Sequence, residues 1–412
     1  MAIPVRPILS ALTHHKAGAF LIALQVALTL AIVANAIFVI SQRVIYISRP
    51  SGIDESNIVI VDNRWVGTLT SEQAQAKTAS DLAMLRQLPG VVDAYADYSF
   101  PAAGPWASVW GISLDVNQKS PTSFAEPYFA DQHALATYGV RLVAGRNFRA
   151  DEVTPGSQLE QSTRGPIIIT QDLAGKLFPG GSSLGKVVYV GGVVRTIIGV
   201  ISDMEVPSVG TRSFAYRSVL SPIRLADTGG DQYIVHASAG QAERLRQSLA
   251  ADLYKVSRLR VIDAADGVQS FHALRAKAYS RDHGLVMLLS AASIILLLAT
   301  AGGIIGITMF WVDERQRQIG LRRALGARRS DILAHVLTEN FLIIFLGISI
   351  GSVLAFATNV ALMHFLEMTR LPTLYIALGS AVLLTLGQCA ALMPARRAAQ
   401  MSPMEATRVA IG

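Results

Sequence analysis

Residues 313–329 read DERQRQIGLRRALGARR and lie between two long apolar runs. The run before them, residues 284–312, contains no Lys, Arg, Asp or Glu, and the run after them extends over residues 332–366. A short segment between two spans lies on one face of the membrane, and an excess of Arg over acidic residues indicates the cytoplasmic face. Residues 313–331 are therefore predicted to be a cytoplasmic segment between two spans.

The apolar residues of this segment have helical spacing and predict a docking helix. Ile319, Leu321, Ala324 and Leu325 are expected to form one apolar stripe bordered by arginines. Such a helix would press against a soluble partner. The residues expected to make the contact are Arg315, Ile319, Gly320, Leu321, Arg322, Arg323, Leu325 and Gly326.

The composition lies between that of a soluble protein and that of a protein embedded throughout in a membrane. The chain has 412 residues, of which 51% are hydrophobic and 16% charged, and its mean hydropathy is +0.40. The net charge of +7 comes largely from basic residues that flank apolar runs, which favours a topology signal over a nucleic-acid surface. The single cysteine, Cys389, excludes a disulfide framework.

Four apolar segments are long enough to cross a bilayer, which requires about 20 residues. They cover residues 17–41, 284–312, 332–366 and 371–394, and the last is expected to end at Pro394. The first could instead be a signal peptide, with Ala34-Asn35-Ala36 as a small-x-small cleavage site. Its apolar run continues past Ala36, which favours a retained anchor.

The basic residues predict that both termini lie in the cytoplasm. Residues 1–16, 313–331 and 395–412 carry the Lys and Arg residues next to the spans, and four spans place these three segments on the same side. Residues 42–283 then form a large extracytoplasmic domain.

That external segment predicts an α+β domain whose two ends resemble each other. Strand–helix–strand patterns at residues 57–98 and 232–262 bracket a strand-rich section at residues 100–225. Gly191-Gly192, between two strand-like runs, predicts a hairpin turn. Residues 269–283 read as a helical stalk that continues into the second span. The expected fold class is four transmembrane α-helices with a large α+β domain, made of two βαβ-like halves and a strand-rich insertion, between the first and second helices.

Polar residues inside the spans predict contacts between helices, because they are costly when they face lipid. Glu339 and Asn340 lie near the cytoplasmic end of the third span, where Glu339 can pair with an arginine or be solvated at the interface. The other polar residues of this kind are Gln25, Asn35, Asn359 and Gln388.

Two small-residue motifs in the spans permit close approach of helices. They are Gly302-x-x-x-Gly306 in the second span and Gly347-x-x-x-Gly351 in the third. The partner helix can belong to the same chain or to a second copy.

No catalytic or metal-binding group is readable in the sequence. The eight histidines lack the spacing of a zinc site. Residues 180–187, GGSSLGKV, fit the pattern G-x-x-x-x-G-K, but Val187 stands where a P-loop needs Ser or Thr, and the segment follows a predicted helix and opens a strand. We expect a structural turn there, and no catalytic residue, metal or cofactor bound by the chain.

Several stretches resemble the MacB/FtsX-type ABC transporter permeases. In the membrane part these are ERQRQIGLRRALGARRSDIL, followed by a span bearing TEN, and PARRAAQMSPMEATR after the last span. In the external part, GVRLVAGRNFRADE, PIIITQDLAGKLFPGGSSLGKVVYV and IIGVISDM resemble the MacB-type periplasmic domain. The resemblance covers nearly the whole chain. It departs from MacB in that no fused ATPase domain precedes the first span, so the ATPase is expected to be a separate polypeptide.

The resemblance implies a non-catalytic permease subunit in the inner membrane, of the type VII, mechanotransmission class. A cytoplasmic ABC ATPase dimer would use ATP and Mg²⁺ and push on residues 319–329, and the movement would pass along the second span to the external domain. The expected partners are that ATPase, a second permease (the same chain or a paralogue), membrane lipid, and a periplasmic adaptor with an outer-membrane channel, but no nucleic acid. One alternative is an FtsX-like or lipoprotein-releasing role. The other is a membrane receptor, for which residues 395–412 are too short to form a signalling domain.

Overall fold

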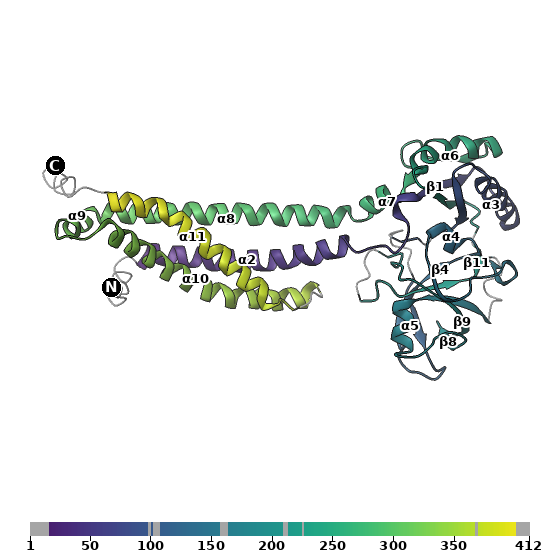
Figure 1. The fold of residues 1–412 in the computed structure, drawn as a ribbon, viewed down its shortest axis with the longest axis horizontal. Helices are drawn as coiled ribbons and strands as arrows, with labels where there is room; N and C mark the ends of the chain where they lie inside the picture. The colour runs from purple at the N-terminus through teal and green to yellow at the C-terminus, as the bar shows by residue number, and fades with distance from the viewer. Residues whose placement is uncertain are drawn as a thin grey trace. The chain divides into compact units, whose positions relative to one another are not determined.

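The computed structural model describes residues 16–97, 100–101, 108–156, 164–208, 213–224, 226–366 and 370–400. The chain divides into two compact units, one of residues 1–47 with 282–412 and the other of residues 48–281. We call the first the helical unit and the second the sheet unit, after the elements that each contains (Figure 1).

Within the described residues, the helical unit contains four long helices and one short helix. The long helices are α2 (Lys16–Ile47), α8 (Ser280–Glu314, whose first two residues belong to the sheet unit), α10 (Arg329–Leu366) and α11 (Thr373–Gln400). Each is long and apolar enough to cross a membrane. The short helix α9 (Gln316–Ala324) joins α8 to α10. The four expected spans are therefore all helical, and each helix runs past the predicted span at one end or both.

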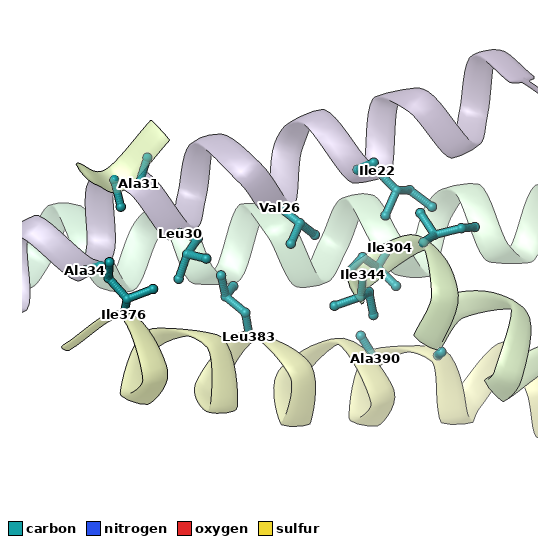
Figure 2. Close-up of a cluster of buried hydrophobic side chains, with 14 of the residues drawn as sticks. Ile22, Val26, Leu30, Ala31, Ala34, Ile304, Ile344, Ile376, Leu383 and Ala390 are labelled. Atoms are coloured by element: carbon teal, nitrogen blue, oxygen red, sulfur yellow. The ribbon is translucent and has the colours of Figure 1, made fainter. Parts of the chain in front are cut away.

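The core of the helical unit forms around α2 (Figure 2). Val26 and Leu30 of α2 lie in one buried cluster with Ile344 of α10 and Leu383 of α11, and Ile304 of α8 contributes to the same cluster. The helices differ in how much of their apolar length the chain covers: 50% of the apolar window of α2 is buried, against 11% for α8. The helices α2, α10 and α11 form a packed group, whereas α8 leaves most of its apolar surface uncovered.

The helix of the fourth span does not end at Pro394, the residue at which the span is expected to end. The helix α11 continues through this residue to Gln400. Proline lacks the N–H group that would bond to the carbonyl four residues earlier, which normally weakens a helix. Here Ala395 and Ala398 are fully buried against residues of α8, α9 and α10, so packing after the proline holds the last turns in place.

The sheet unit contains a five-stranded sheet that interleaves the two ends of the external segment. Its strand order is β13-β1-β12-β2, and β14 also pairs with β1. The strands are β1 (Ile58–Trp65), β2 (Val91–Ala96), β12 (Gly230–Ala237), β13 (Arg260–Val261) and β14 (Val268–Ser270). Because β12 lies between β1 and β2 and runs antiparallel to both, the two predicted βαβ-like halves are inserted into each other rather than set side by side.

Alternation along β1 sends side chains to two separate cores, as expected for a strand. Val59 and Val61 face a cluster that includes residues of α3 (Ser71–Leu85) and α6 (Ala242–Val256). Ile58 and Ile60 face a second cluster that includes residues of α4 (Ala134–Tyr138) and of the other sheet. The five-stranded sheet is therefore covered on both faces.

The strand-rich insertion forms a seven-stranded sheet in the order β5-β9-β7-β10-β4-β3-β8. An additional pairing of β8 with β9 closes six of the strands into a ring. The bounds are β3 (Trp110–Ser113), β4 (Ser123–Phe129), β5 (Leu142–Gly145), β7 (Arg164–Thr170), β8 (Val187–Val190), β9 (Val193–Ile201) and β10 (Ser218–Ser221), with α5 (Gln171–Leu177) after β7 and a separate pair formed by β6 (Thr154–Pro155) and β11 (Ile223–Arg224). The predicted hairpin turn at Gly191-Gly192 is confirmed: Val190 pairs with Val193, and both glycines have positive φ, 56° and 84°.

A buried ion pair ties α3 to the edge strand β13. Arg260 donates to both carboxylate oxygens of Asp81 at 2.8 Å, and both side chains are almost fully excluded from solvent. The hydroxyl of Tyr233 donates to the same carboxylate at 2.6 Å, and Arg260 lies over the ring of Trp65. A buried charge is costly unless it is paired and hydrogen-bonded, and this pair meets both conditions.

The expected continuous stalk is interrupted. Gln269 and Ser270 belong to β14, the helix α7 covers Phe271–Ala278, and Tyr279 has φ of −91° and ψ of 6°, outside the helical region, before α8 begins at Ser280. Helix propensity alone would allow one helix here, but strand pairing of β14 with β1 fixes the start of this segment, and the burial of the Tyr279 side chain accompanies the break.

Candidate coupling site

The α8–α9 junction turns the chain at a single residue. The helix α8 ends at Glu314, and Arg315 has φ of −95° and ψ of 11°, outside the helical region, before α9 begins at Gln316. The helix α9 ends at Ala324, Leu325 caps it, and Gly326 follows with a φ of +100°, a conformation that favours glycine. The segment predicted from its arginines is thus a short helix bounded by two turns.

One face of α9 is fixed to the helical unit at three successive turns. The Nη1 atom of Arg315 lies 3.0 Å and 2.9 Å from the two carboxylate oxygens of Glu339 in α10. Four residues later, Ile319 packs in a cluster with residues of α8, α10 and α11. Four residues further, Nη1 of Arg323 donates to the carbonyl oxygen of Ala399 near the end of α11, at 3.2 Å.

Glu339 and Asn340 form the buried polar part of this junction. Glu339 is 5% exposed and Asn340 1% exposed. The amide oxygen of Asn340 accepts from the hydroxyl of Thr308 in α8 at 3.2 Å, and its nitrogen donates to the carbonyl of Val336. Of the two settings left open for Glu339, the structure shows pairing with an arginine, and that arginine is Arg315.

The opposite face of α9 is exposed. Leu321 is 63% exposed and Leu325 80% exposed, and Arg322 is exposed beside them. The expectation of one apolar stripe through Ile319, Leu321 and Leu325 is therefore wrong. Residues 319 and 321 are two positions apart and point about 200° apart around a helix, so the packing of Ile319 against α10 and α11 turns the two leucines outward.

The predicted contact residues consequently divide into two groups. Arg315, Ile319 and Arg323 make contacts within the chain, and Gly320 is buried beside them. The residues on the outward side are Leu321, Arg322, Leu325 and Gly326.

The two glycine motifs also behave differently. A Cβ on Gly347 or Gly351 would lie 2.7 Å or 2.8 Å from a backbone oxygen of α2, so both glycines permit close packing of α10 on α2. At Gly302 and Gly306 such an atom would meet nothing within 4 Å in the described part of the chain. The motif Gly347-x-x-x-Gly351 thus packs against another helix of the same chain. The motif Gly302-x-x-x-Gly306 lies on the uncovered surface of α8.

Two of the other four polar residues in the spans bond to a neighbouring helix, as predicted, and a third bonds to the segment before α11. Gln25 donates to the carbonyl of Ala299, and Asn35 donates to that of Ala355. The side-chain oxygen of Asn359 accepts from the backbone of Leu371. Gln388 is half-buried.

A second junction, at the other end of α8, was not predicted from the sequence. Tyr279, the residue between α7 and α8, donates its hydroxyl proton to Glu205 at 2.5 Å. Glu205 also accepts from Nε of Arg49 at 2.6 Å, and Nη2 of Arg275 lies 3.7 Å from it. Arg275 bonds to Glu55 and to the carbonyl of Arg49. Glu205 therefore ties the residues that follow α2 to those that precede α8.

Two further tyrosines surround Glu205. Tyr128 donates to the backbone carbonyl of Glu205, and Tyr216 donates to the carbonyl of Pro50 at 2.8 Å. Burial and then the negative charge of Glu205 raise the pKa of Tyr216, so its hydroxyl stays protonated as a donor. The sequence carries no local signal for this site, since Glu205 and Tyr279 are separated by 74 positions.

The remaining sequence candidates are the segment GGSSLGKV and the histidines. Residues 180–187 lie between α5 and β8 as a turn, with positive φ at Gly180 and Gly185, so they follow a helix and open a strand as predicted. Among the described residues, no group of three or more His, Cys, Asp or Glu side chains could hold a metal ion. His133 and His236 instead pair with Asp93 and Asp54 in the sheet unit.

Comparison with known proteins identifies the family. The model for the MacB-like periplasmic core domain matches residues 19–252, and the model for the FtsX-like permease C-terminal domain matches residues 290–403. The chain therefore belongs to the MacB/FtsX-type permease family, as its sequence motifs predicted. Its four apolar helices and this membership make it a membrane protein of the inner membrane.

Individual relatives are similar over most of the chain. It is 27% identical to the macrolide export ATP-binding/permease protein MacB of Chromobacterium violaceum over 77% of its length and 48% of that protein. It is 25% identical to the protein of the same name from Shewanella sp. ANA-3 over 97% of its length and 59% of that protein. The chain thus spans about half the length of these curated relatives.

Among solved structures, the periplasmic region of MacB from Actinobacillus actinomycetemcomitans matches 55% of this chain and 94% of its own length. The identity is 13% and the TM-score 0.33, too low to add to the assignment.

Proposed function

We propose that this chain is the permease subunit of an ABC export system that passes motion from an ATPase to the sheet unit. The observation that carries the proposal is the two-sided helix α9, whose inner face is fixed to α10 and α11 while Leu321 and Leu325 point outward. Two exposed leucines beside an exposed arginine suit a groove on a soluble partner, with the leucines as anchors and the charge at the rim. Membership in the permease family makes an ABC ATPase dimer that hydrolyses ATP with Mg²⁺ the proposed partner. The chain itself would bind no cofactor.

The proposed orientation follows from the basic residues next to the spans. Arg6 and Lys16, the arginines of residues 313–331 and those of residues 395–412 would all lie in the cytoplasm. The sheet unit would then lie in the periplasm. There its movement would drive a substrate toward a periplasmic adaptor and an outer-membrane channel, and macrolides, after which the relatives are named, are the first class to test.

A second permease, a copy or a paralogue, is proposed to cover α8. This helix has the smallest buried share of the four spans, and Gly302 and Gly306 lie on its surface with nothing of the described chain against them. Small residues on an uncovered span allow close approach of another helix.

Capture of the ATPase from detergent extracts tests the coupling role. We expect Leu325→Asp to weaken binding of the ABC ATPase by about 2 kcal/mol or more, roughly 30-fold, because a charge would replace an apolar anchor. Arg328→Ala, a change in the exposed turn after α9, is the control and should bind normally. Full, substrate-responsive ATP hydrolysis with Leu325→Asp would disprove this docking site.

Cysteine labelling tests the orientation in a Cys389→Ser background. A membrane-impermeant maleimide should reach Ser182→Cys, an exposed position of the sheet unit, while the inner membrane is intact. It should reach Gln318→Cys on α9 only after that membrane is opened. The reverse pattern would overturn the proposed topology.

A further inference from the structure

Arg315 occupies a hinge position and also carries the contact that can lock the hinge. It is the single residue outside helical geometry between α8 and α9, so rotation of its backbone could absorb a displacement of α9. Its side chain, however, reaches 24 residues along the chain to Glu339, a buried residue of α10. The guanidinium is only 17% exposed and the carboxylate 6%. A pair that is largely shielded from water has a stronger attraction than a surface pair.

The two sides of this hinge are held to different extents. The helix α9 contacts α10 and α11 through Arg315, Ile319 and Arg323, at three successive turns of one face. The helix α8 is mostly uncovered by the chain. A push on Leu321 and Leu325 therefore meets a helix that is held to α10 and α11 at three successive turns. Its contacts with α8 lie next to the turn, where Ile319 packs near Val312 and Arg315 lies over the ring of Trp311.

We propose that Arg315 and Glu339 are positioning residues that form a latch, so that α9 moves as one body with α10 and α11. The proposal rests on the proposed coupling function and adds to it the route of the movement. With the latch closed, a push on α9 is delivered to the group of α2, α10 and α11. With the latch open, the backbone at Arg315 absorbs the push, and the ATPase can bind and hydrolyse ATP without moving the rest of the chain.

A simpler role for the pair would be to neutralise Glu339 inside the membrane. The double variant Arg315→Gln/Glu339→Gln separates the two roles, because it removes both charges and leaves no unpaired charge behind. Neutralisation alone predicts normal behaviour of this variant. The latch predicts that its α9 becomes loose.

The first experiment measures the position of α9 in the full chain in lipid nanodiscs, without any ATPase. Spin labels at Gln318→Cys on α9 and Thr385→Cys on α11, both exposed, report the distance between these helices in a Cys389→Ser background. We expect one narrow distance in the otherwise native chain and a broad distribution in the double variant. Labels at Ala334→Cys on α10 and Thr385→Cys form the matched control pair, whose distance should be the same in both. A narrow, unchanged α9–α11 distance in the double variant would overturn the latch.

The second experiment adds the ABC ATPase and ATP and follows labels at Ser182→Cys and Gln318→Cys. In the native background ATP should change this distance, whereas in the double variant the change per ATP hydrolysed should fall about tenfold, within the range measured for residues that couple distant sites. ATPase binding should be unchanged, and Arg396→Gln, which removes an exposed charge from α11, should behave as the native chain.

The outcomes separate the latch from the function on which it rests. If the native background neither binds the ATPase nor responds to ATP, the proposed function fails, while the α9–α11 distances still decide whether the latch exists. If the native chain and the double variant respond equally, the latch is wrong and the function stands. Should the double variant not insert into membranes, Arg315→Lys decides the question, because a lysine keeps the charge but lacks the planar guanidinium whose Nη1 atom reaches both carboxylate oxygens. It should broaden the α9–α11 distance partly, and an unchanged distance would again overturn the latch.

Discussion

The two ends of α8 share a break in helical geometry but differ in the contacts that surround the break. At each end a single residue leaves helical geometry, Tyr279 at the start and Arg315 at the finish, and its side chain reaches a buried glutamate far along the chain. At the Arg315 end one ion pair makes the contact to Glu339. At the Tyr279 end, Glu205 accepts hydrogen bonds from Arg49 and Tyr279, and Arg275 lies nearby.

The difference reflects the surroundings of each junction. In the sheet unit, loops and strands bring Arg49, Arg275 and Tyr279 to one carboxylate, so the network can satisfy a buried charge from several sides. Within a bundle of apolar helices few polar side chains are available, and in the described part of the chain Glu339 pairs with Arg315. We therefore expect the junction with several donors to cost more free energy to disrupt than the junction with a single ion pair. Four changes test this comparison, from the largest expected effect to the smallest.

Glu205→Ala should have the largest effect. It leaves Arg49 and Tyr279 without their buried acceptor, and removing one partner of a buried ion pair typically costs about 3–5 kcal/mol. Thermal unfolding of the full chain, with hydrogen exchange in β1 and β12 to locate the loss, measures it. Glu55→Ala, which removes a partly exposed partner of Arg275, is the control and should cost at most about 1 kcal/mol. Equal losses for the two variants would show that the Tyr279 end is not a network centred on Glu205.

Tyr279→Phe should have the next largest effect. The change removes one hydroxyl that donates to a charged carboxylate, and such a hydrogen bond contributes about 1.5–3 kcal/mol. Tyr216→Phe, whose hydroxyl donates to a neutral carbonyl, should cost less in the same unfolding measurement. If Tyr279→Phe lowers stability no more than Tyr216→Phe does, the hydrogen bond from Tyr279 to Glu205 does not contribute to this junction.

Thr308→Val examines the Arg315 end. It removes the donor to the buried amide oxygen of Asn340, beside the ion pair, and hydrogen bonds between membrane helices contribute about 0.6 kcal/mol on average. A steric-trapping assay in mixed micelles measures the free energy of unfolding finely enough to detect this loss of stability. Thr385→Val, whose hydroxyl donates to carbonyls of α11 itself at an exposed position, is the matched control. A cost above about 3 kcal/mol would place this junction in the same class as the one around Glu205.

Asp282→Asn should have the smallest effect. Asp282, near the start of α8, pairs with Arg43 of α2 at 2.6 Å, and both side chains are partly exposed. Pairs of this kind contribute about 0.2–1 kcal/mol. The same micelle assay should therefore show little change, and raised salt should reduce the difference further. A loss as large as that of Glu205→Ala would show that α8 is held at its start by α2 rather than through Tyr279.

The sequence by itself determined the parts of this protein that depend on local pattern and on length. The four apolar runs are helices because a long apolar segment that crosses a membrane can satisfy its backbone hydrogen bonds internally as a helix. The helix at Ala242–Val256 and the turn at Gly191-Gly192 agree with the prediction because residues near each other in sequence decide them. The family follows from motifs spread over nearly the whole chain.

Only the tertiary structure decided which side of a helix is buried and where a helix breaks. The helix α11 continues through Pro394 because Ala395 and Ala398 are packed, and the predicted stripe of α9 divides because Ile319 turns inward. The contacts of Glu339 and Glu205 join residues 24 and 74 positions apart. Such contacts depend on the path of the whole chain, and no local spacing of residues encodes that path.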